Sequence, residues 1–334
     1  MSGILALGIE IKHMRKNLLI LIFGLLGSVA ALAQEGLPFY SHYLVADEYL
    51  INPSYAGANP EVLSVTGSYR NQWGDLPESP NTQTVSVHAT VVDRLAFGFY
   101  VFNDRNGLSS LRGANLSAAY HIPINSRRDY YDDEEEDIFS FGLSYNFFQQ
   151  KLDIDKIEGV DWNDDLLKED SYNLNYFNLG ISFRYAGAFG GISVLDIPLV
   201  DNEAVADGVE PLPTWYYFML GYQVRLGDVI RLDPSIVMNL NSNSERQLDL
   251  NLMSHIAFGD RQQGVDLGLS YRQDIDKNGS QGLSISPIMK LKIGGLKVGM
   301  SYDIGLSDIA KEAGNGILFS LGYNFGNPFN PDWR

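Results

Sequence analysis

The residues best suited to binding or chemistry lie in one stretch, YRNQWGDLPESPNTQT, at positions 69–84. A guanidinium, two amide side chains and an indole fall within five positions, from Tyr69 to Trp73. Pro77 and Pro80 prevent the following segment from pairing as a regular strand. Such a cluster suits either a binding loop or part of an enzyme site, and the choice depends on the element that carries it.

A second candidate is a run of six consecutive acidic residues. Calcium binds several carboxylates, but at a designed spacing that a simple run does not provide. The run is interpreted as a solvated loop that repels itself, and a docking surface for a basic periplasmic partner stays open as an alternative. Its members are Asp132, Asp133, Glu134, Glu135, Glu136 and Asp137.

Other groupings are weaker candidates. Residues 274–279 (DIDKNG) begin like an EF-hand loop, but Ile285 occupies the position of the required glutamate. Four histidines follow residue 33, without the spacings typical of a zinc site: His42, His88, His121 and His255. Since no nucleophile motif of the G-x-S-x-G type occurs either, we predict no catalytic residue, metal site or cofactor.

The N-terminus predicts an exported protein. A basic Met14–Asn17 precedes an apolar Leu18–Gly27, and Ala31–Ala33 forms an A-x-A cleavage site. Residues 1–33 are therefore predicted to be a cleaved signal peptide, and Met14 could serve as its true start.

Composition excludes several classes of protein. Removal of residues 1–33 takes away three basic residues and one acid, so the net charge goes from −17 to −19. Such a charge repels phosphates, and we predict no nucleic-acid partner. The chain has no cysteine, which excludes disulfides and thiolate zinc sites. After the signal peptide, no apolar run is long enough for a membrane-spanning helix.

Alternation of apolar and polar residues predicts strands instead. In residues 316–325 (GILFSLGYNF), large apolar side chains occupy every second position and mostly small or polar residues the others. Residues 139–147, 266–272 and 297–302 follow the same pattern. A soluble sandwich would bury the large face, whereas an outer-membrane barrel would turn it to lipid. The signal peptide, the segment lengths near ten and the number of segments favour the barrel.

We predict about fourteen antiparallel strands within residues 61–325. Short links alternate with longer ones, among them 73–81, 104–111, 150–172, 196–213, 274–279 and 305–315. Short periplasmic turns and long outer loops are typical of bacterial barrels, but the acidic link 125–137 is long on the short-turn side. Residues 34–60 are predicted to form an N-terminal plug or periplasmic rim segment, and residues 326–334 a periplasmic tail.

Four ordered motifs give the chain a family resemblance. They are an N-P-x-Y-A-G box (Asn52, Pro53, Tyr55, Gly57), a Y-R-N-Q-W box (Tyr69, Arg70, Asn71, Gln72, Trp73), a P-x-T-Q-T box (Pro80, Thr82, Gln83, Thr84) and an N-D-x-x-G element (Asp104, Gly107). With these motifs the sequence resembles PorP/SprF proteins, outer-membrane components associated with the type IX secretion system and gliding motility in Bacteroidetes.

The resemblance implies a non-enzymatic outer-membrane barrel that aids export or surface anchoring of cargo proteins such as adhesins. Implied partners are outer-membrane lipid, periplasmic ring and motor proteins, a peptidoglycan-associated protein, and the C-terminal sorting domain of a secreted adhesin. A core secretion component and a cargo-specific paralogue both fit. A channel for small or hydrophobic solutes is the alternative function.

The alternation also gives the 69–84 stretch a place in the barrel. Tyr69 is expected to face lipid, and Arg70 and Gln72 the lumen. There they could fasten the N-terminal segment through hydrogen bonds to backbone carbonyls, and we favour this interpretation over a catalytic one.

Overall fold

The computed structural model describes residues 43–76, 78–124, 137–153, 171–199, 212–227, 229–242, 245–258, 263–276 and 279–329. The predicted signal peptide, residues 1–33, lies outside these ranges, as do residues 34–42 of the predicted plug segment. Within the described residues, no helix is long and apolar enough to span a membrane.

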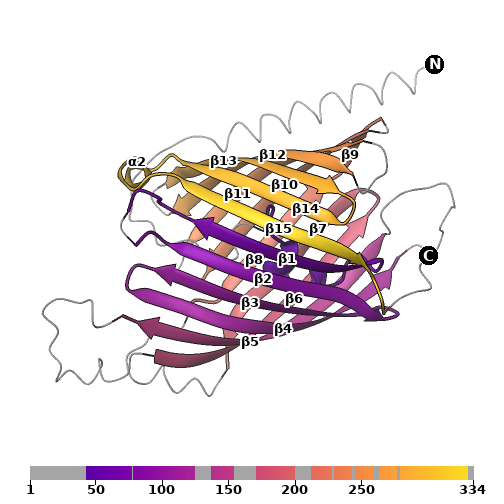
Figure 1. Cartoon of the computed structure of the whole chain (residues 1–334), viewed down its shortest axis with the longest axis horizontal. Coiled ribbons are helices and arrows are strands. Elements are labelled where there is room, and N and C mark those ends of the chain that lie inside the picture. Colours follow the sequence, from indigo (N-terminus) through magenta and orange to yellow (C-terminus); the bar gives the residue numbers. More distant parts are fainter. Residues whose placement is uncertain are drawn as a thin grey trace, which may run out of the picture.

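One antiparallel sheet closes on itself. Strand β1 (Val62–Asn71) pairs with β2 (Asn81–Val92) on one side and with the last strand, β15 (Gly316–Gly326), on the other. In Figure 1 the yellow β15 accordingly lies beside the indigo β1. The remaining strands each pair with their sequence neighbours, except that β8 and β9 both pair with β10 and not with each other. The predicted antiparallel barrel is thus confirmed.

The barrel has fourteen strands, as predicted. Strands β8 (Trp215–Tyr222) and β9 (Val224–Leu226) both pair with β10, and only Gln223 separates them, so they form one interrupted strand. The others are β3 (Leu95–Asn106), β4 (Ser109–Pro123), β5 (Ile138–Leu152), β6 (Ser171–Tyr185), β7 (Ala188–Pro198), β10 (Ile230–Asn241), β11 (Arg246–Ala257), β12 (Gly264–Asp276), β13 (Gly279–Ile293) and β14 (Leu296–Gly305).

The two faces of the sheet differ as the alternation predicts. In β5, Phe141 and Leu143 are exposed on the outside, whereas Ser144 and Asn146 are buried in the lumen. The same pattern recurs along the other strands, so the outside of the barrel is a belt of exposed aromatic and aliphatic side chains. Such an apolar belt is favourable in the hydrocarbon of a bilayer and unfavourable in water.

Tight turns gather at one end of the barrel, which we call the short-turn end. They lie at positions 93–94, 186–187 and 294–295, and β1 begins and β15 ends at the same end. Asp93 (φ 44°) and Ala186 (φ 49°) adopt the left-handed conformation typical of two-residue hairpins. The acidic link belongs to this end as well, because β4 and β5 pair up to Pro123 and Ile138. It is therefore a long connection among short turns.

At the opposite end, which we call the long-loop end, the structure differs from two predicted loops. The predicted loop 104–111 is wrong, since β3 and β4 pair as far as Asn106 and Ser109. The predicted loop 274–279 is wrong for the same reason, because β12 and β13 pair as far as Asp276 and Gly279. The backbone ladder holds these strands together beyond the apolar belt, where polar residues no longer show the alternation. Gly107 (φ 57°) supplies the left-handed residue for the first turn.

The predicted loop 305–315 contains a short helix, α2 (Asp308–Ala313), which the sequence interpretation did not include. The Ser307 side chain caps it by accepting a hydrogen bond from the Ala310 amide. Its last residue lies against the first long-end loop, because the amide of Asp75 donates to the carbonyl of Ala313.

Residues 43–57, which we call the lumenal segment, lie inside the barrel. They form two single-turn 3-10 helices, η1 (Glu48–Leu50) and η2 (Pro53–Tyr55). Buried apolar side chains of the segment pack on aromatic side chains that project inward from the strands. The core cluster includes Tyr43, Tyr49, Leu50, Ile51 and Ala56 from the segment and Tyr100, Phe102, Phe148, Leu174, Tyr176 and Tyr217 from the wall.

Candidate functional site

The first family box forms a compact turn within the lumenal segment. The Asn52 side chain caps η2 by accepting hydrogen bonds from the amide (3.0 Å) and the hydroxyl (2.7 Å) of Ser54. Pro53 occupies the first helical position, where its fixed φ is favourable and its missing N–H costs nothing. Asn52 and Ser54 are buried and Tyr55 is half-buried, so the box presents a rigid face to the barrel wall.

Glycines on the inner wall make room for this turn. A Cβ at Gly142 on β5 would overlap the backbone of Pro53 and Ser54, and a Cβ at Gly180 on β6 would overlap the Asn52 side chain. Gly142 and Gly180 are register partners, so together they form one side-chain-free notch in the wall. The box is thus fitted to a surface that only glycine provides.

Hydrogen bonds then fix the turn in the notch. The Asn52 amide donates to the Ile181 carbonyl (3.1 Å), and the Ser54 and Ser182 hydroxyls lie 2.8 Å apart, within hydrogen-bond distance. On the next strand, the Ser193 hydroxyl donates to the carbonyl of Ile51. Each satisfies a polar group that burial would otherwise leave unpaired.

Two histidines hold the end of the box. The amide of Gly57 donates to Nδ1 of His88 (3.0 Å), and Nε2 of His121 lies 2.8 Å from the carbonyl of Ala56. The Thr90 hydroxyl donates to the carbonyl of Gly57, whose φ of 63° is left-handed. Both histidines therefore bind the backbone of the lumenal segment, which is a structural role.

Asp47 extends this anchor to the start of η1. One carboxylate oxygen caps η1 through the Tyr49 amide, and the other accepts from the Ser86 hydroxyl (2.8 Å) and lies 3.3 Å from His88 Nε2. Burial alone would raise the pKa of Asp47, but interactions with His88, Lys297 and Ser86 hold it at about 2. The segment is thus anchored by a charged as well as a neutral set of contacts.

Contacts with other strands also hold the lumenal segment. The Tyr49 hydroxyl lies within hydrogen-bond distance of Asn115 and Ser117, both on β4. Across the barrel, the Asn251 amide donates to the Tyr43 hydroxyl and the Ser320 hydroxyl to the Val45 carbonyl. The segment therefore touches strands on opposite sides of the lumen.

The second and third boxes meet at the long-loop end. Tyr69 is 42% exposed on the outside, whereas Arg70 is only 4% exposed in the lumen, as the alternation predicts. The Arg70 guanidinium donates to the Gln72 side chain (2.6 Å). Within the described residues, no hydrogen bond joins either side chain to the lumenal segment. For residues 43–57 the fastening is made by the residues described above, and the role predicted for Arg70 and Gln72 stays a prediction for residues 34–42, which lie outside the described residues.

The remaining motif residues shape this rim. Asn71 donates through its side chain to Ser79, and the Gln72 amide donates to the Pro80 carbonyl, which closes the loop. Trp73 has a left-handed backbone (φ 55°) at the turn. The Thr82 hydroxyl donates to Asp104 on β3, Thr84 bonds Ser68 in the lumen, and Gln83 points outward opposite Tyr69.

The acidic residues 132–136 lie outside the described residues. Asp137 is described, and its carboxylate accepts a hydrogen bond from the amide of Ala186 in the neighbouring short turn. Its loop therefore emerges next to the β6–β7 hairpin.

Substitution of Arg70 by alanine is expected to destabilise the barrel by about 1–3 kcal/mol, because a buried acceptor on Gln72 loses its partner. Asp303 and Asp104, which interact electrostatically with Arg70, would lose a nearby cation as well. Urea unfolding in detergent micelles measures the change. Arg94→Ala is the control, since Arg94 is exposed and its nearest acid is Asp93 at 4.0 Å, and a change within about 0.5 kcal/mol is expected. Equal losses in both variants would contradict the role given to Arg70.

The closed fourteen-stranded sheet, its apolar outer belt and its polar inner wall define a membrane-spanning β-barrel of the outer-membrane class. A family model described as type IX secretion system membrane protein PorP/SprF matches residues 32–323. The chain belongs to this family, and it is an outer-membrane protein that crosses the bilayer with its strands.

Comparison with solved structures finds other barrels of low sequence identity. A Pseudomonas aeruginosa FadL homologue has a TM-score of 0.47 at 10% identity, covering 88% of this chain and 99% of that one. OmpF of Salmonella typhi has a TM-score of 0.33 at 9% identity, covering 79% and 96%. The KdgM porin has a TM-score of 0.34 at 9% identity, covering 78% and 99%. A comparison with curated proteins finds no match.

Proposed function

We propose that this barrel is a non-enzymatic component of type IX secretion that aids export or surface anchoring of cargo proteins through protein–protein contacts. The cargo class is proteins with their own C-terminal sorting domain, adhesins among them. Family membership places the chain in the context of the secretion machinery, and the role within it is the proposal.

The observation that carries the proposal is the set of contacts that holds the lumenal segment inside the barrel. Its family box forms hydrogen bonds with β2, β4, β6 and β7, and the segment also bonds β11 and β15. Because the lumen holds part of the protein's own chain, we favour a role in which the rims hold partner proteins. Transport of solutes through the lumen is the less favoured role. The residues 34–60 therefore serve as a plug in this proposal.

The acidic loop is the proposed contact for the periplasmic machinery. The short-turn end is periplasmic by the usual asymmetry of bacterial barrels, and the long link between β4 and β5 emerges there. Asp132–Asp137 would attract a basic surface on a ring or motor protein or a peptidoglycan-associated protein.

Affinity purification of the tagged barrel from outer membranes tests these contacts. We expect periplasmic components of the secretion system to co-purify, and neutralisation of Asp132–Asp137 to Asn and Gln to reduce their yield at physiological salt. A control variant with two acids neutralised on the opposite rim, Asp75→Asn and Glu78→Gln, should keep it. Unchanged recovery with the neutralised loop would refute the docking role, provided the variant still assembles into the membrane.

A further inference from the structure

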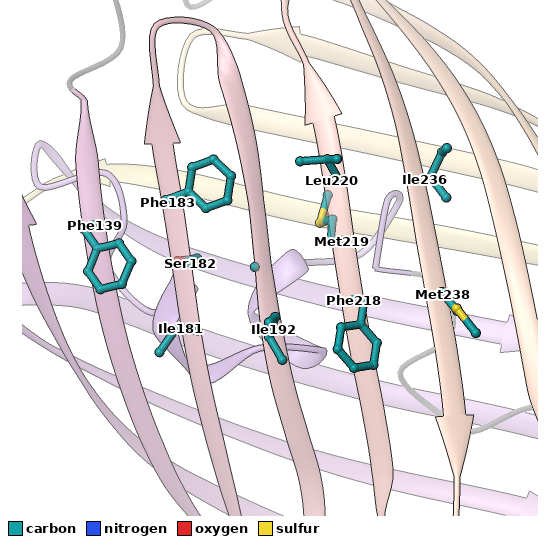
Figure 2. Close-up of a pocket in the computed structure, with 11 residues that line it drawn as sticks. Phe139, Ile181, Ser182, Phe183, Ile192, Phe218, Met219, Leu220, Ile236 and Met238 are labelled. Atoms are coloured by element: carbon teal, nitrogen blue, oxygen red, sulfur yellow. The ribbon is translucent and has the colours of Figure 1, made fainter. Parts of the chain in front are cut away.

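The lipid-facing surface of the barrel has an apolar groove that runs across strands β5 to β10. Its lining residues come from β5, β6, β7, β8 and β10, and most of them are large apolar side chains. Figure 2 shows Phe139, Phe183, Leu220 and Ile236 on the strands that form the groove. The groove that they line has a volume of about 440 Å³, within the range of roughly 300–1,000 Å³ typical of ligand sites.

The lining of the groove selects a hydrocarbon. Of its eleven lining residues, only Ser182 has a polar side chain, and that hydroxyl is already bonded by Ser54 from the lumen. Ile192, Phe218 and Leu220 are exposed on the outside and belong to the apolar belt. A ligand here would gain apolar contact and find no free hydrogen-bonding side chain, which suits an acyl chain and disfavours a polar solute.

The position of the groove indicates which lipid supplies that chain. Phe183 is close to the last residue of β6, and Phe139 is close to the first residue of β5, so the groove lies toward the short-turn end. That end is periplasmic by the asymmetry described above, and the periplasmic leaflet of an outer membrane consists of glycerophospholipid. We propose that the groove between β6 and β10 binds one acyl chain of a glycerophospholipid.

The floor of the groove is the wall that seats the family box. Gly191 lies against the Asn52 amide, and Met219 sulfur is 3.7 Å from the Tyr55 hydroxyl, both on the lumenal side. A test must therefore change an outward residue and leave this wall intact. Leu220 meets the requirement, since it is 61% exposed to the outside.

Photocrosslinking tests the site directly. The purified full-length barrel is reconstituted in phosphatidylethanolamine–phosphatidylglycerol vesicles doped with phosphatidylethanolamine that carries a diazirine in its acyl chain. After irradiation, adducts are mapped by peptide mass spectrometry. We expect adducts to concentrate on β6–β10, and Leu220→Trp, which fills the groove, to lower them about fivefold. Leu321→Trp on β15 is the matched control, because Leu321 is also 61% exposed, and it should leave the groove adducts unchanged.

Adducts spread evenly around the belt, or equal effects of the two tryptophans, would overturn the proposal. Circular dichroism and resistance to dissociation in detergent confirm that both variants are folded. In a second arm, lipids retained by the barrel purified from outer membranes are identified by mass spectrometry. Retained phospholipid that Leu220→Trp depletes supports the assignment. Retention of lipopolysaccharide or of an acylated protein in its place contradicts it.

Discussion

Replacement of Gly180 by alanine is expected to release the lumenal segment from the barrel wall. The added Cβ would overlap the Asn52 side chain and Pro53. The cap of η2 and the hydrogen bond to the Ile181 carbonyl both require the side-chain amide of Asn52 at its present position. Overpacking of this kind costs about 1–3 kcal/mol, so the undocked fraction should rise roughly 5- to 150-fold.

Thiol labelling measures the release, because the chain has no cysteine of its own. Ile51→Cys, at a position that is 1% exposed, places a single thiol next to the family box without removing a side-chain hydrogen bond, and it serves as the common background. Gly67→Ala is the control, since a Cβ there would meet only ordinary contacts at 3.8–3.9 Å. Faster labelling in the Gly180→Ala barrel alone is expected. The same rate in both glycine variants would show that the notch does not hold the segment.

Asp47→Asn is expected to loosen the other end of the same segment. The amide would keep the cap on the Tyr49 amide but would remove the charge that interacts with His88 and Lys297. The lowering of the Asp47 pKa from 3.8 to about 2 corresponds to about 2 kcal/mol of stabilisation by the charged form. The undocked fraction should therefore rise by roughly 30-fold at neutral pH.

The same labelling assay checks this prediction against Glu61→Gln, which removes an exposed acid just beyond the segment. Glu61→Gln should label at the background rate. If the two charge removals had the same effect, net charge and not the anchor would explain it.

Acid should weaken the anchor in a defined direction. Because the pKa of Asp47 is lower in the folded barrel than its ordinary value of 3.8, its contribution is fully present above about pH 4 and is lost as the pH falls toward 2. His88 and Lys297 are the charged or titratable groups that face it. The Asp47→Asn barrel should lack the part of the acid response that this carboxylate causes.

The strands could be predicted from sequence because their signal is local. Lipid on one side and a polar lumen on the other impose a period of two, as in Phe141, Leu143, Ser144 and Asn146 of β5. Where the apolar belt ends, the signal ends with it, and the strands around Asn106 and Asp276 were predicted too short. Their pairing depends on the backbone ladder, which has no sequence pattern of its own.

The contacts that hold the lumenal segment could not be predicted in the same way, because the residues that make them are far apart in the chain. Ser54 and Ser182 are separated by 128 positions, and Gly142 and Gly180 have the same appearance in sequence as any small lumenal residue. The N-P-x-Y-A-G box was identified as a motif, but only the fold shows that it fits against these glycines. His88 and His121 lack metal-site spacing and bind the backbone at Gly57 and Ala56.

Localisation of cargo after removal of the gene is the most direct test of the proposed function. The measurement compares adhesins and other secreted proteins on the cell surface, in the medium and inside the cell, with and without the barrel. Loss of cargo from the surface, with accumulation inside the cell or release to the medium, is the result we predict, and restoration by the wild-type gene should reverse it. Normal secretion and attachment without the barrel would contradict the proposed function.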